Sequence, residues 1–424
     1  MMIESLQSRQ TSFFSSPVIY ARMTGMFFEK KNRTGPRMGA SDFGYLQAGS
    51  CYLDAACQTL RPQAVLDTET EYYTRYNACG GRVKYDWGTT VDNKVRAARK
   101  ALLSYAGKSE KEYCVAFTLN TTYGINLVLH QLAAGSFERI VTSDIEHNSV
   151  LLPSMTWAKR NNAPHLVLPR TEDGSLVYVP ADIARSIVVV NTMSNIDGRT
   201  LQNAAALAHD VHAANGLLIV DGAQGFGHAP EILRQTDFDI ACGSGHKMYG
   251  PSIGFIIIRR SVLATLTPFF IGGGTVSDVM LDDYSLLGEG DEAHAILEAG
   301  LQNWSGILGL GAAVNWLQHT DHAKEQQLSQ MLFDGLRKES RVHVLNAQPS
   351  SIVSFHTDGI DAHQMAIYLS EQNIMCRSGH FCCHRYLAHQ RKLPPLLRIS
   401  LGLYNTPQHI DRCLSALHTI LTTL

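Results

Sequence analysis

The sequence lacks any uninterrupted apolar run near the roughly 20 residues that a membrane-spanning helix needs, and it has no polybasic stretch. Lysine and arginine together number 36, against 38 aspartate and glutamate residues, and both signs are mixed along the chain. Nothing in this charge pattern favours a nucleic acid or a membrane surface as a partner. The composition, 45% hydrophobic and 17% charged, is that of a globular protein.

A disulfide framework is also lacking. Nine cysteines are scattered over 424 residues without the regular spacing of small secreted proteins, which indicates free thiols in a reducing compartment and a cytoplasmic location. Residues 1–50 contain several basic side chains, but Glu4 comes early and no apolar h-region follows. They are predicted to form an N-terminal arm that packs on the body or on a partner subunit, rather than a transit peptide.

An alternation of strand-like and helix-like segments occupies the first two thirds of the chain. Several strand-like segments are apolar without alternation, as expected where both faces of a sheet are covered. Residues 201–215 place apolar side chains at helical spacing and stop before Gly216. This alternation predicts an α/β fold with a mostly parallel sheet in a large domain over residues 66–305. The predicted strands are residues 139–146, 165–169, 186–193, 217–221, 237–242 and 254–260.

The pattern changes after about residue 305. A long helical run is followed by two strand-like segments, a helix from Asp361, a third strand-like segment and a last helix that begins at Thr406-Pro407, a good N-cap and first-turn pair. We predict a smaller C-terminal α+β domain made of residues 51–65 and 306–424, with strands at 341–346, 351–357 and 396–402.

One lysine stands in the stretch "ACGSGHKMYGP" (241–251), just past a predicted strand. A charged lysine buried there without a partner would cost several kcal/mol. In one interpretation, the side chain of Lys247 simply reaches solvent or a carboxylate. In the other, its amine forms a Schiff base with an aldehyde cofactor.

Pyridoxal phosphate would need further groups, and other strand ends supply them. Asp221 ends the segment "LLIVD", where its carboxylate could keep the ring nitrogen of the cofactor protonated. His147 can lie over the ring, and Asn195 can bond the phenolic oxygen. A helix that begins near Thr121 and Thr122 favours a phosphate at its N-terminus. Each feature alone is weak, because a strand-end aspartate is often a cap and a single histidine is more often structural. Together they favour the cofactor.

"DGAQ" and "SGHKMYGP", with "EHNS" and "NTTYGIN" upstream, resemble the class V aminotransferase family of fold type I pyridoxal phosphate enzymes, from about residue 51 to the end. Within that family the sequence is most similar to cysteine desulfurases of the sulfur-mobilisation branch and to selenocysteine lyases. The resemblance implies a large sheet of the seven-stranded type and a homodimer with active sites at the subunit interface. It implies that Lys247 is the Schiff-base lysine and Asp221 the partner of the ring nitrogen.

The same resemblance implies roles for the remaining cofactor-binding residues. His147 would stack on the ring, and Gln224 and Asn195 would hold the phenolic oxygen. The phosphate would be bound by Thr121 or Thr122, Ser244 and His246.

The reaction is inferred from "CRSGHFCCHRYL" (376–387). Arg377, Gly379, His380 and Cys382 match an Arg-x-Gly-His-x-Cys stretch that carries the nucleophilic cysteine in the resembled desulfurases. The resemblance implies that the Cys382 thiolate attacks the substrate sulfur, so that L-cysteine becomes L-alanine and a persulfide remains. It makes Lys247, Cys382 and His147 the expected catalytic residues, and Arg398, Arg377 and Asn195 the expected substrate-binding residues.

Other interpretations of this stretch stay open. Cysteine often behaves as a small buried apolar residue, which would make Cys382 structural. The crowding of potential ligands also allows a metal site, although their spacing fits no usual zinc pattern and we expect no metal. These ligands are Cys376, His380, Cys382, Cys383, His384 and His389.

The sequence departs from the family on the substrate and dimer side. Leu301 stands where a threonine usually reaches the phosphate of the partner subunit, residues 77–90 lack a His-Arg-Gly segment, and no proline follows the cysteine loop. A C–S or C–Se β-lyase or an amino-acid epimerase is therefore an alternative function, and a non-catalytic binding protein is a second. We expect a small amino acid as substrate, L-cysteine first, with a sulfur-acceptor protein as a further partner.

Overall fold

The computed structural model describes residues 40–47, 49–81, 83–133, 135–287 and 290–423. In this part of the chain seven strands form one sheet in the order β2-β8-β7-β6-β5-β3-β4. All pairs are parallel except those of β8, which runs antiparallel to both neighbours. The strands are β2 (Tyr113–Thr118), β3 (Arg139–Ser143), β4 (His165–Leu168), β5 (Ser186–Asn191), β6 (Leu217–Asp221), β7 (Ile240–Ser244) and β8 (Gly254–Arg259).

The prediction of an α/β fold with a mostly parallel sheet is confirmed. Each of the predicted segments between 139 and 260 contains a strand, but β2 was not predicted. Its six residues are all buried, and an apolar segment of this length cannot be told from a buried helical turn by periodicity alone.

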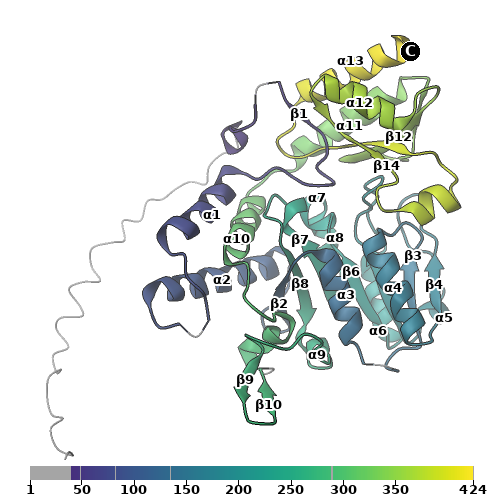
Figure 1. Ribbon diagram of the computed structural model, residues 1–424. Helices are drawn as coiled ribbons and strands as arrows, with labels where there is room; N and C mark the ends of the chain where they lie inside the picture. The colour runs from purple at the N-terminus through teal and green to yellow at the C-terminus, as the bar shows by residue number, and fades with distance from the viewer. Residues whose placement is uncertain (1–39, 48, 82, 134, 288–289, 424) are drawn as a thin grey trace, which may run out of the picture. The chain divides into compact units, whose positions relative to one another are not determined.

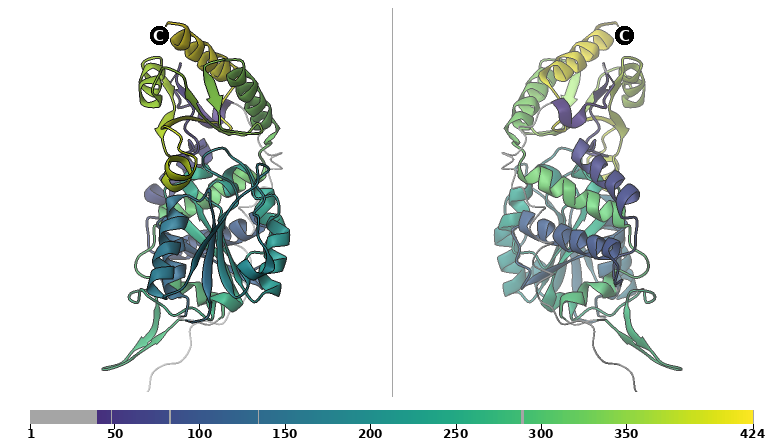
Figure 2. Two further views of the ribbon diagram at one scale, coloured as in Figure 1. Left: turned by 90° about the vertical axis from the view of Figure 1, so that its right-hand side faces the viewer. Right: turned by 90° about the vertical axis from the view of Figure 1, so that its left-hand side faces the viewer.

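Helices cover both faces of this sheet (Figures 1 and 2). Alternate strand residues enter two different hydrophobic cores: Val188 and Val220 pack in one core, while Ile187 and Ile219 pack in the other. The first core is closed by α2 (Asp86–Tyr105), α6 (Ala204–Ala213) and α10 (Trp304–Gln318), and the second by α3 (Thr121–Gln131) and α4 (Asn148–Arg160). Burial on both faces explains the continuous apolar runs of the strand sequences.

A second sheet lies in the C-terminal part of the chain, in the order β11-β12-β15-β14. Its strands are β11 (Val342–Val344), β12 (Ile352–Thr357), β14 (Arg377–Gly379) and β15 (Leu396–Ser400). The helices α11 (Ala323–Arg337), α12 (Ala362–Glu371) and α13 (Pro407–Thr423) share one hydrophobic core with it.

Residues 51–54 join this C-terminal part although they precede the large sheet in the chain. Strand β1 (Cys51–Tyr52) pairs in parallel with β13 (Ile374–Met375), and Asp54 forms a β-bridge with Ser400. The domain boundaries given above stay a prediction, and residues 1–39 and 48 of the predicted N-terminal arm lie outside the described residues.

The remaining elements are short, apart from α1 (Gln63–Arg75). Strands β9 (Val276–Val279) and β10 (Tyr284–Leu286) form an antiparallel hairpin of their own. No helix among the described residues is long and apolar enough to cross a bilayer. The other elements are α5 (Pro180–Ile183), α7 (Gly225–His228), α8 (Pro230–Gln235), α9 (Arg260–Leu263), the 3-10 turns η1 (Ala40–Phe43), η2 (Gly245–Lys247) and η3 (Gly290–Leu297), and the π-helical turn η4 (Arg385–Gln390).

Candidate active site

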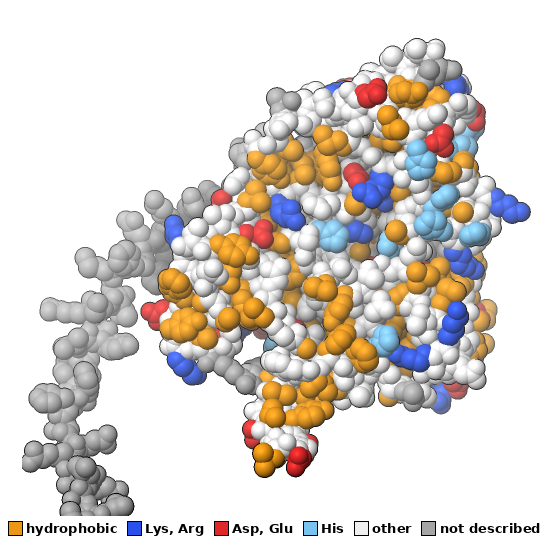
Figure 3. Space-filling view, viewed as in Figure 1, with side chains coloured by type: hydrophobic (Ala, Val, Ile, Leu, Met, Phe, Trp, Pro, Cys, Tyr) orange, Lys and Arg blue, Asp and Glu red, His pale blue; other side chains and the backbone are white. Residues whose placement is uncertain are grey.

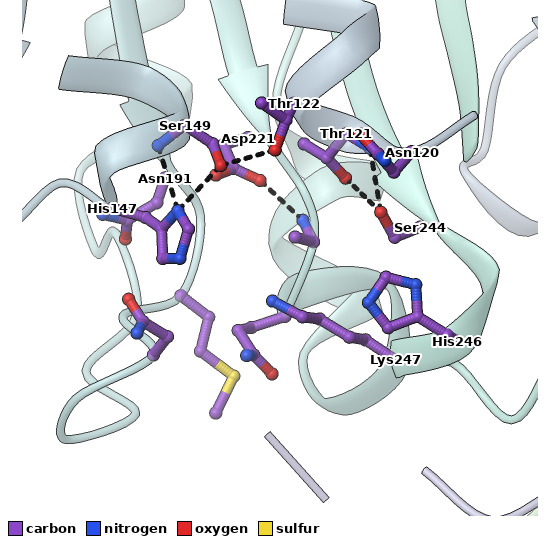
Figure 4. Close-up of a pocket in the computed structure, with 14 residues that line it drawn as sticks. Asn120, Thr121, Thr122, His147, Ser149, Asn191, Asp221, Ser244, His246 and Lys247 are labelled. Carbon is purple, nitrogen blue, oxygen red and sulfur yellow. Dashed lines mark hydrogen bonds between the residues drawn. The ribbon is translucent and has the colours of Figure 1, made fainter. Parts of the chain in front are cut away.

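A cavity of about 280 Å³ lies at the carboxyl ends of the large sheet's parallel strands (Figure 4). In an α/β sheet this edge is where loops from several strands converge. All of the predicted cofactor-binding residues line the cavity, and five further residues join them. The predicted set is Thr121, Thr122, His147, Asn195, Asp221, Gln224, Ser244, His246 and Lys247, and the additional residues are Asn120, Ser149, Asn191, Met193 and Ala223.

Lys247 ends the 3-10 turn η2 that follows β7 directly, and Figure 4 shows its side chain projecting into the cavity. The pKa of its amine is lowered, first because the surrounding protein removes the ammonium from water and then because Arg398 is nearby, while Asp221 opposes this shift. A lowered lysine pKa increases the fraction of neutral amine, which is the form that acts as a nucleophile or base.

Asp221 is the last residue of β6 and lies beside Asn191, the last residue of β5. Its Oδ1 accepts a hydrogen bond of 2.9 Å from the backbone N–H of Ala223. Burial raises the pKa of the Asp221 carboxyl, and the Ala223 N–H and Lys247 counteract that rise. A cationic group bound opposite this carboxyl would favour its charged form.

His147 caps the N-terminus of α4 and is held in a neutral form. Its Nδ1 accepts a hydrogen bond of 3.0 Å from the backbone N–H of Ser149, so in the neutral ring Nε2 carries the proton. Burial and the charges of Lys247 and Arg398 lower the pKa of His147 to about 3. The uncharged imidazole is thereby a flat, weakly polar face on the cavity wall.

The N-terminus of α3 and the end of β7 meet on the opposite side of the cavity. Asn120 caps α3 by accepting a hydrogen bond of 2.9 Å from the Tyr123 N–H. The Ser244 hydroxyl lies 2.7 Å from the Thr121 hydroxyl and also accepts the Thr121 N–H at 2.9 Å. Hydroxyls around a helix N-terminus form a favourable anion site. Burial and neighbouring cations lower the pKa of His246 in this corner to about 4.

Two buried amide oxygens on the cavity wall have no protein partner among the described residues. Gln224 is 3% exposed, and its Nε2 donates to the Ala56 carbonyl at 2.7 Å while Oε1 is left unpaired. The Oδ1 of Asn191 is also unpaired. Leaving a buried polar atom unsatisfied costs about 1–3 kcal/mol. A polar ligand in the cavity would remove that cost, so the wall fits pyridoxal phosphate in its polarity and in its charges.

Asn195 lines the cavity and also bonds residues outside it. Its Nδ2 donates to the Phe381 carbonyl at 2.8 Å, and its Oδ1 accepts from the Cys383 thiol at 3.4 Å. The Asn195 side chain therefore joins the cavity wall to the cysteine loop, defined here as residues 379–384.

Cys382 is exposed and lies beside the cavity rather than in its wall. Its backbone carbonyl accepts a hydrogen bond of 2.7 Å from the N–H of Asn148, the residue after His147. Phe381 and Cys382 have φ angles of 48° and 58°, a left-handed conformation that is uncommon for non-glycine residues and is stored at functional sites more often than elsewhere. Cys382 is therefore an exposed residue whose backbone is fixed next to the start of α4.

Cys383 differs from Cys382 in its exposure. Its side chain is buried, it donates to Asn195, and burial raises the pKa of its thiol strongly. A buried thiol with a raised pKa is a poor nucleophile.

The alternative metal site of the cysteine loop is not assembled. Within the described ranges, the one group of at least three potential ligands with all ligand atoms within 4.8 Å is His343, His356 and Asp358, on and just after β11 and β12. None of these three lines the cavity.

The two predicted substrate arginines converge on a carboxylate that the sequence did not indicate. Arg398 is 3% exposed, and its Nη2 lies 3.1 Å from Asp54 Oδ1. Arg377 is about half exposed and lies 3.0 Å from Asp54 Oδ2. Arg398 also donates to the Asn195 carbonyl at 2.9 Å and lies over the ring of Phe381. Nothing in "YLDAA" marks Asp54, because its partners lie more than 300 residues away.

A buried ion pair between Glu146 and Arg170, which lies behind the cavity, was also not predicted from the sequence. Glu146 Oε2 accepts from the backbone N–H and from the Nδ2 of Asn191, both at 2.9 Å. Arg170 lies 3.4 Å from Glu146 and donates to the Asn191 carbonyl at 2.6 Å. The pair fixes the end of β5 and the residue before His147. A buried charge needs such a partner, so Glu146 at the end of the predicted strand 139–146 was the available signal.

The sequence matches a model of the aminotransferase class-V family over residues 51–413. Curated relatives include the cysteine desulfurase CsdA of Escherichia coli, which is 29% identical over 93% of this chain and 99% of the relative. A probable cysteine desulfurase of Haemophilus influenzae is 31% identical over 88% of this chain and 86% of the relative.

Solved structures with the same architecture include E. coli CsdA, with a TM-score of 0.80 and 27% identity over 92% of this chain and 100% of that one. The apo cysteine desulfurase of Thermococcus onnurineus has a TM-score of 0.82 at 27% identity, with the same coverage. The fold type I expectation is therefore confirmed.

Proposed function

The chain belongs to the aminotransferase class-V family, and from that premise we propose that it is a pyridoxal-phosphate-dependent cysteine desulfurase. It converts L-cysteine to L-alanine and leaves the sulfur as a persulfide on Cys382. When bound, the cofactor supplies an aldehyde for amine groups and a ring that withdraws electrons from the substrate. The observation that carries the proposal is the position of Cys382, hydrogen bonded beside His147 at the rim of a cavity that contains Lys247 and Asp221.

Lys247 anchors the cofactor through its amine and, once released, removes the substrate α-proton. The lowered pKa of this amine supports both steps, because each needs the neutral form at the start. Asp221 holds a proton on the ring nitrogen, and the neutral His147 ring packs against the cofactor face.

The remaining wall residues orient the cofactor. The N-terminus of α3 with Thr121, Thr122 and Ser244 binds the phosphate, and His246 lies in the same corner. Gln224 and Asn195 would hold the phenolic oxygen, and the unpaired Gln224 Oε1, which can only accept, would take a hydrogen bond from a phenolic hydroxyl.

Arg398 binds the substrate α-carboxylate. A planar guanidinium suits a bidentate carboxylate, and its buried Nε is without a partner in the described structure. Asp54 fixes the Nη2 end of the guanidinium, so the Nε edge is the one left for substrate. Arg377 adds a second positive charge on the exposed side of Asp54.

The Cys382 thiolate attacks the substrate sulfur, and the carbon–sulfur bonding electrons pass to the substrate carbon skeleton. The exposed position of Cys382 lets a sulfur-acceptor protein reach the persulfide. Cys383 serves as a packing residue of the loop.

The protein acts as a homodimer. An apolar face made by residues 269–284 and Leu301 supports this assignment, and Figure 3 shows hydrophobic side chains around the β9–β10 hairpin. Leu301 is 78% exposed and cannot donate to a phosphate, so a subunit contact at this position is apolar. The exposed residues are Phe269, Phe270, Ile271, Val279, Met280, Leu281, Tyr284 and Leu301.

The experiment that tests the function incubates the cofactor-loaded protein with L-cysteine and quantifies alanine, sulfide and pyruvate. A desulfurase yields alanine and a persulfide on Cys382, and Cys382→Ala abolishes both while Cys383→Ala preserves them. Pyruvate as the main product, unaffected by Cys382→Ala, would establish the β-lyase instead. Absence of a visible cofactor band after addition of pyridoxal phosphate would establish a non-catalytic protein.

A further inference from the structure

His343, His356 and Asp358 bring three potential metal ligands together at the edge of the second sheet, outside the cavity. One imidazole nitrogen from each histidine and one carboxylate oxygen all lie within 4.8 Å of one another. The Nε2 of His343 is 2.8 Å from the Oδ2 of Asp358. The ring of His356 stacks on the ring of His343, with the two centroids 4.7 Å apart. These three residues are called the histidine–aspartate cluster below.

Backbone pairing holds the cluster together. His343 of β11 and His356 of β12 are directly opposed in the antiparallel ladder, so their side chains lie on the same face of the sheet. The N–H of Asp358 donates to the Arg341 carbonyl at 2.9 Å, and Arg341 Nη2 donates back to the Asp358 carbonyl at 2.7 Å. Val342, the next residue toward β12, packs in the hydrophobic core of this part of the chain. The three ligands are therefore positioned by bonds that do not involve their own side chains.

The ligand atoms of the cluster are accessible to an ion from solvent. The side chains of His343 and Asp358 are 47% and 62% exposed. Among the described residues, His343 is the one basic side chain within ion-pair distance of the Asp358 carboxylate. The half-buried ring of His356 makes no hydrogen bond within the described part of the chain. One imidazole is thus free to bind a metal, and the other needs only to exchange its bond to Asp358.

The chemistry of the ligands selects the class of ion. Two imidazole nitrogens and one carboxylate oxygen suit zinc and neighbouring divalent transition metals, whereas magnesium and calcium prefer oxygen ligands alone. Around a tetrahedral zinc ion with bonds of about 2.0–2.1 Å, ligand atoms lie roughly 3.3 Å from one another. The separation of 2.8 Å between His343 and Asp358 is slightly shorter, and the 4.8 Å limit for the whole cluster is longer. Small side-chain rotations are enough to complete the geometry.

Other histidine–carboxylate pairs in the described structure do not offer the same set. The exposed His418 lies 2.9 Å from Glu339, but no second histidine joins this pair to complete three close ligands. His212 lies 3.0 Å from Asp239, whose carboxylate is also bound by Arg259. A cation already occupies that position, so a metal ion would be repelled from it.

We propose that His343, His356 and Asp358 bind a divalent transition-metal ion of the zinc class, with water at the fourth, solvent-facing position. The ion replaces the proton of the hydrogen bond between His343 Nε2 and Asp358 Oδ2, and this proton passes to solvent. Strand β11 has three residues and lies at the edge of its sheet beside β12, so the ion clamps an edge strand to its neighbour. None of the three ligands lines the cavity, and the proposal is independent of the desulfurase function.

The test is a calorimetric titration of the full-length, cofactor-loaded protein, without an affinity tag, with zinc chloride. Exposed thiols are first blocked with iodoacetamide, so that zinc cannot bind Cys382. The wild type should bind one zinc ion per chain. His343→Ala and His356→Ala should each weaken binding about 100-fold or more, since loss of even an outer partner of a metal ligand costs about 10- to 100-fold. Asp358→Asn keeps an acceptor for the His343 hydrogen bond but loses the carboxylate, and it should weaken zinc binding in the same way.

His418→Gln is the matched control, because it removes an exposed histidine that is paired with a single carboxylate, and it should bind zinc as the wild type does. Zinc should also raise the melting temperature of the wild type, and the three cluster variants should lose this shift while melting like the wild type in EDTA. Absence of saturable zinc binding in the wild type overturns the proposal, and so does binding that survives all three substitutions. Magnesium chloride that binds as tightly as zinc would show an unselective carboxylate site and would overturn it as well.

Discussion

The strand-end wall of the cavity and the cysteine loop differ in how their reactive groups are held. Lys247 and Asp221 follow buried strands of a sheet covered on both faces, and their neighbours are fixed by backbone pairing. The cysteine loop is held to its surroundings by the Asn195 side chain and by the backbone N–H of Asn148. It carries two non-glycine residues, Phe381 and Cys382, in left-handed conformation.

This difference corresponds to two demands of the proposed reaction. Proton transfer and cofactor binding need groups whose positions are set before substrate arrives, and a rigid sheet edge provides them. Sulfur delivery needs a thiol that can approach the substrate and then an acceptor, which a short exposed loop allows. The predictions below act on one region at a time and so test this division.

Replacement of Lys247 by alanine should produce the largest effect. It removes the amine that anchors the cofactor and moves the α-proton, and loss of a general acid–base group alone lowers the rate about 10²- to 10⁴-fold. Alanine formation from L-cysteine and the visible spectrum of the loaded protein measure the two losses. Lys338→Ala, at an exposed position, is the control, and a Lys247→Ala protein with near-normal turnover would refute the assignment.

Arg170→Leu should destabilise the strand-end wall without touching the cysteine loop. Breaking a buried ion pair leaves the carboxylate of Glu146 without its partner and costs about 3–5 kcal/mol. Urea unfolding at neutral pH gives the free energy of unfolding. The exposed pair of Arg185 and Glu138 provides a control, since Arg185→Leu should cost less than about 1 kcal/mol. Equal costs for the two variants would contradict the structural role of the buried pair.

Asp54→Asn should weaken substrate binding more than it slows chemistry. The change removes the carboxylate that positions both arginines, and a hydrogen bond to a charged group contributes about 1.5–3 kcal/mol. We expect KM for L-cysteine to rise about tenfold while kcat changes little. Steady-state kinetics with the exposed Glu138→Gln as a remote control separate the two constants, and an unchanged KM would argue against Arg398 as the carboxylate site.

The smallest effect concerns pH and the histidines of the cavity. The pKa values of His147 and His246, about 3 and about 4, lie below the ordinary 6.5. At a pH between these values and 6.5, the folded state therefore binds fewer protons than the unfolded state. Their contribution to stability is complete above pH 6.5 and is lost as the pH falls toward 4 and 3. Thermal melting of the cofactor-free protein should therefore show a shallower acid dependence in His147→Gln. An acid dependence identical to that of the wild type would show that His147 is not held neutral.

Most of the large sheet was predictable because its strands are short, apolar segments. The stretches between them have apolar residues at helical spacing, so the sequence showed where each strand ends. β2 was missed because it lies before residue 139, where the predicted series of strands begins, and because it pairs with β8, far along the chain. The strands β1, β13 and β14 have only two or three residues each, which is too short for a recognisable pattern. The strands of the β9–β10 hairpin have only four and three residues, and most of these are exposed, so no alternation between a buried and an exposed face marks them.

The sequence by itself determined which groups meet at the cavity, because the carboxyl ends of parallel strands must share one edge of the sheet. It could not determine what holds them there. Asp54 meets Arg398 across 344 positions, Asn195 binds Cys383 across 188, and the segment 56–59 is bonded to Gln224 and His246. Such contacts are decided only when the two parts of the chain pack together, since no local pattern records a partner so far away along the chain.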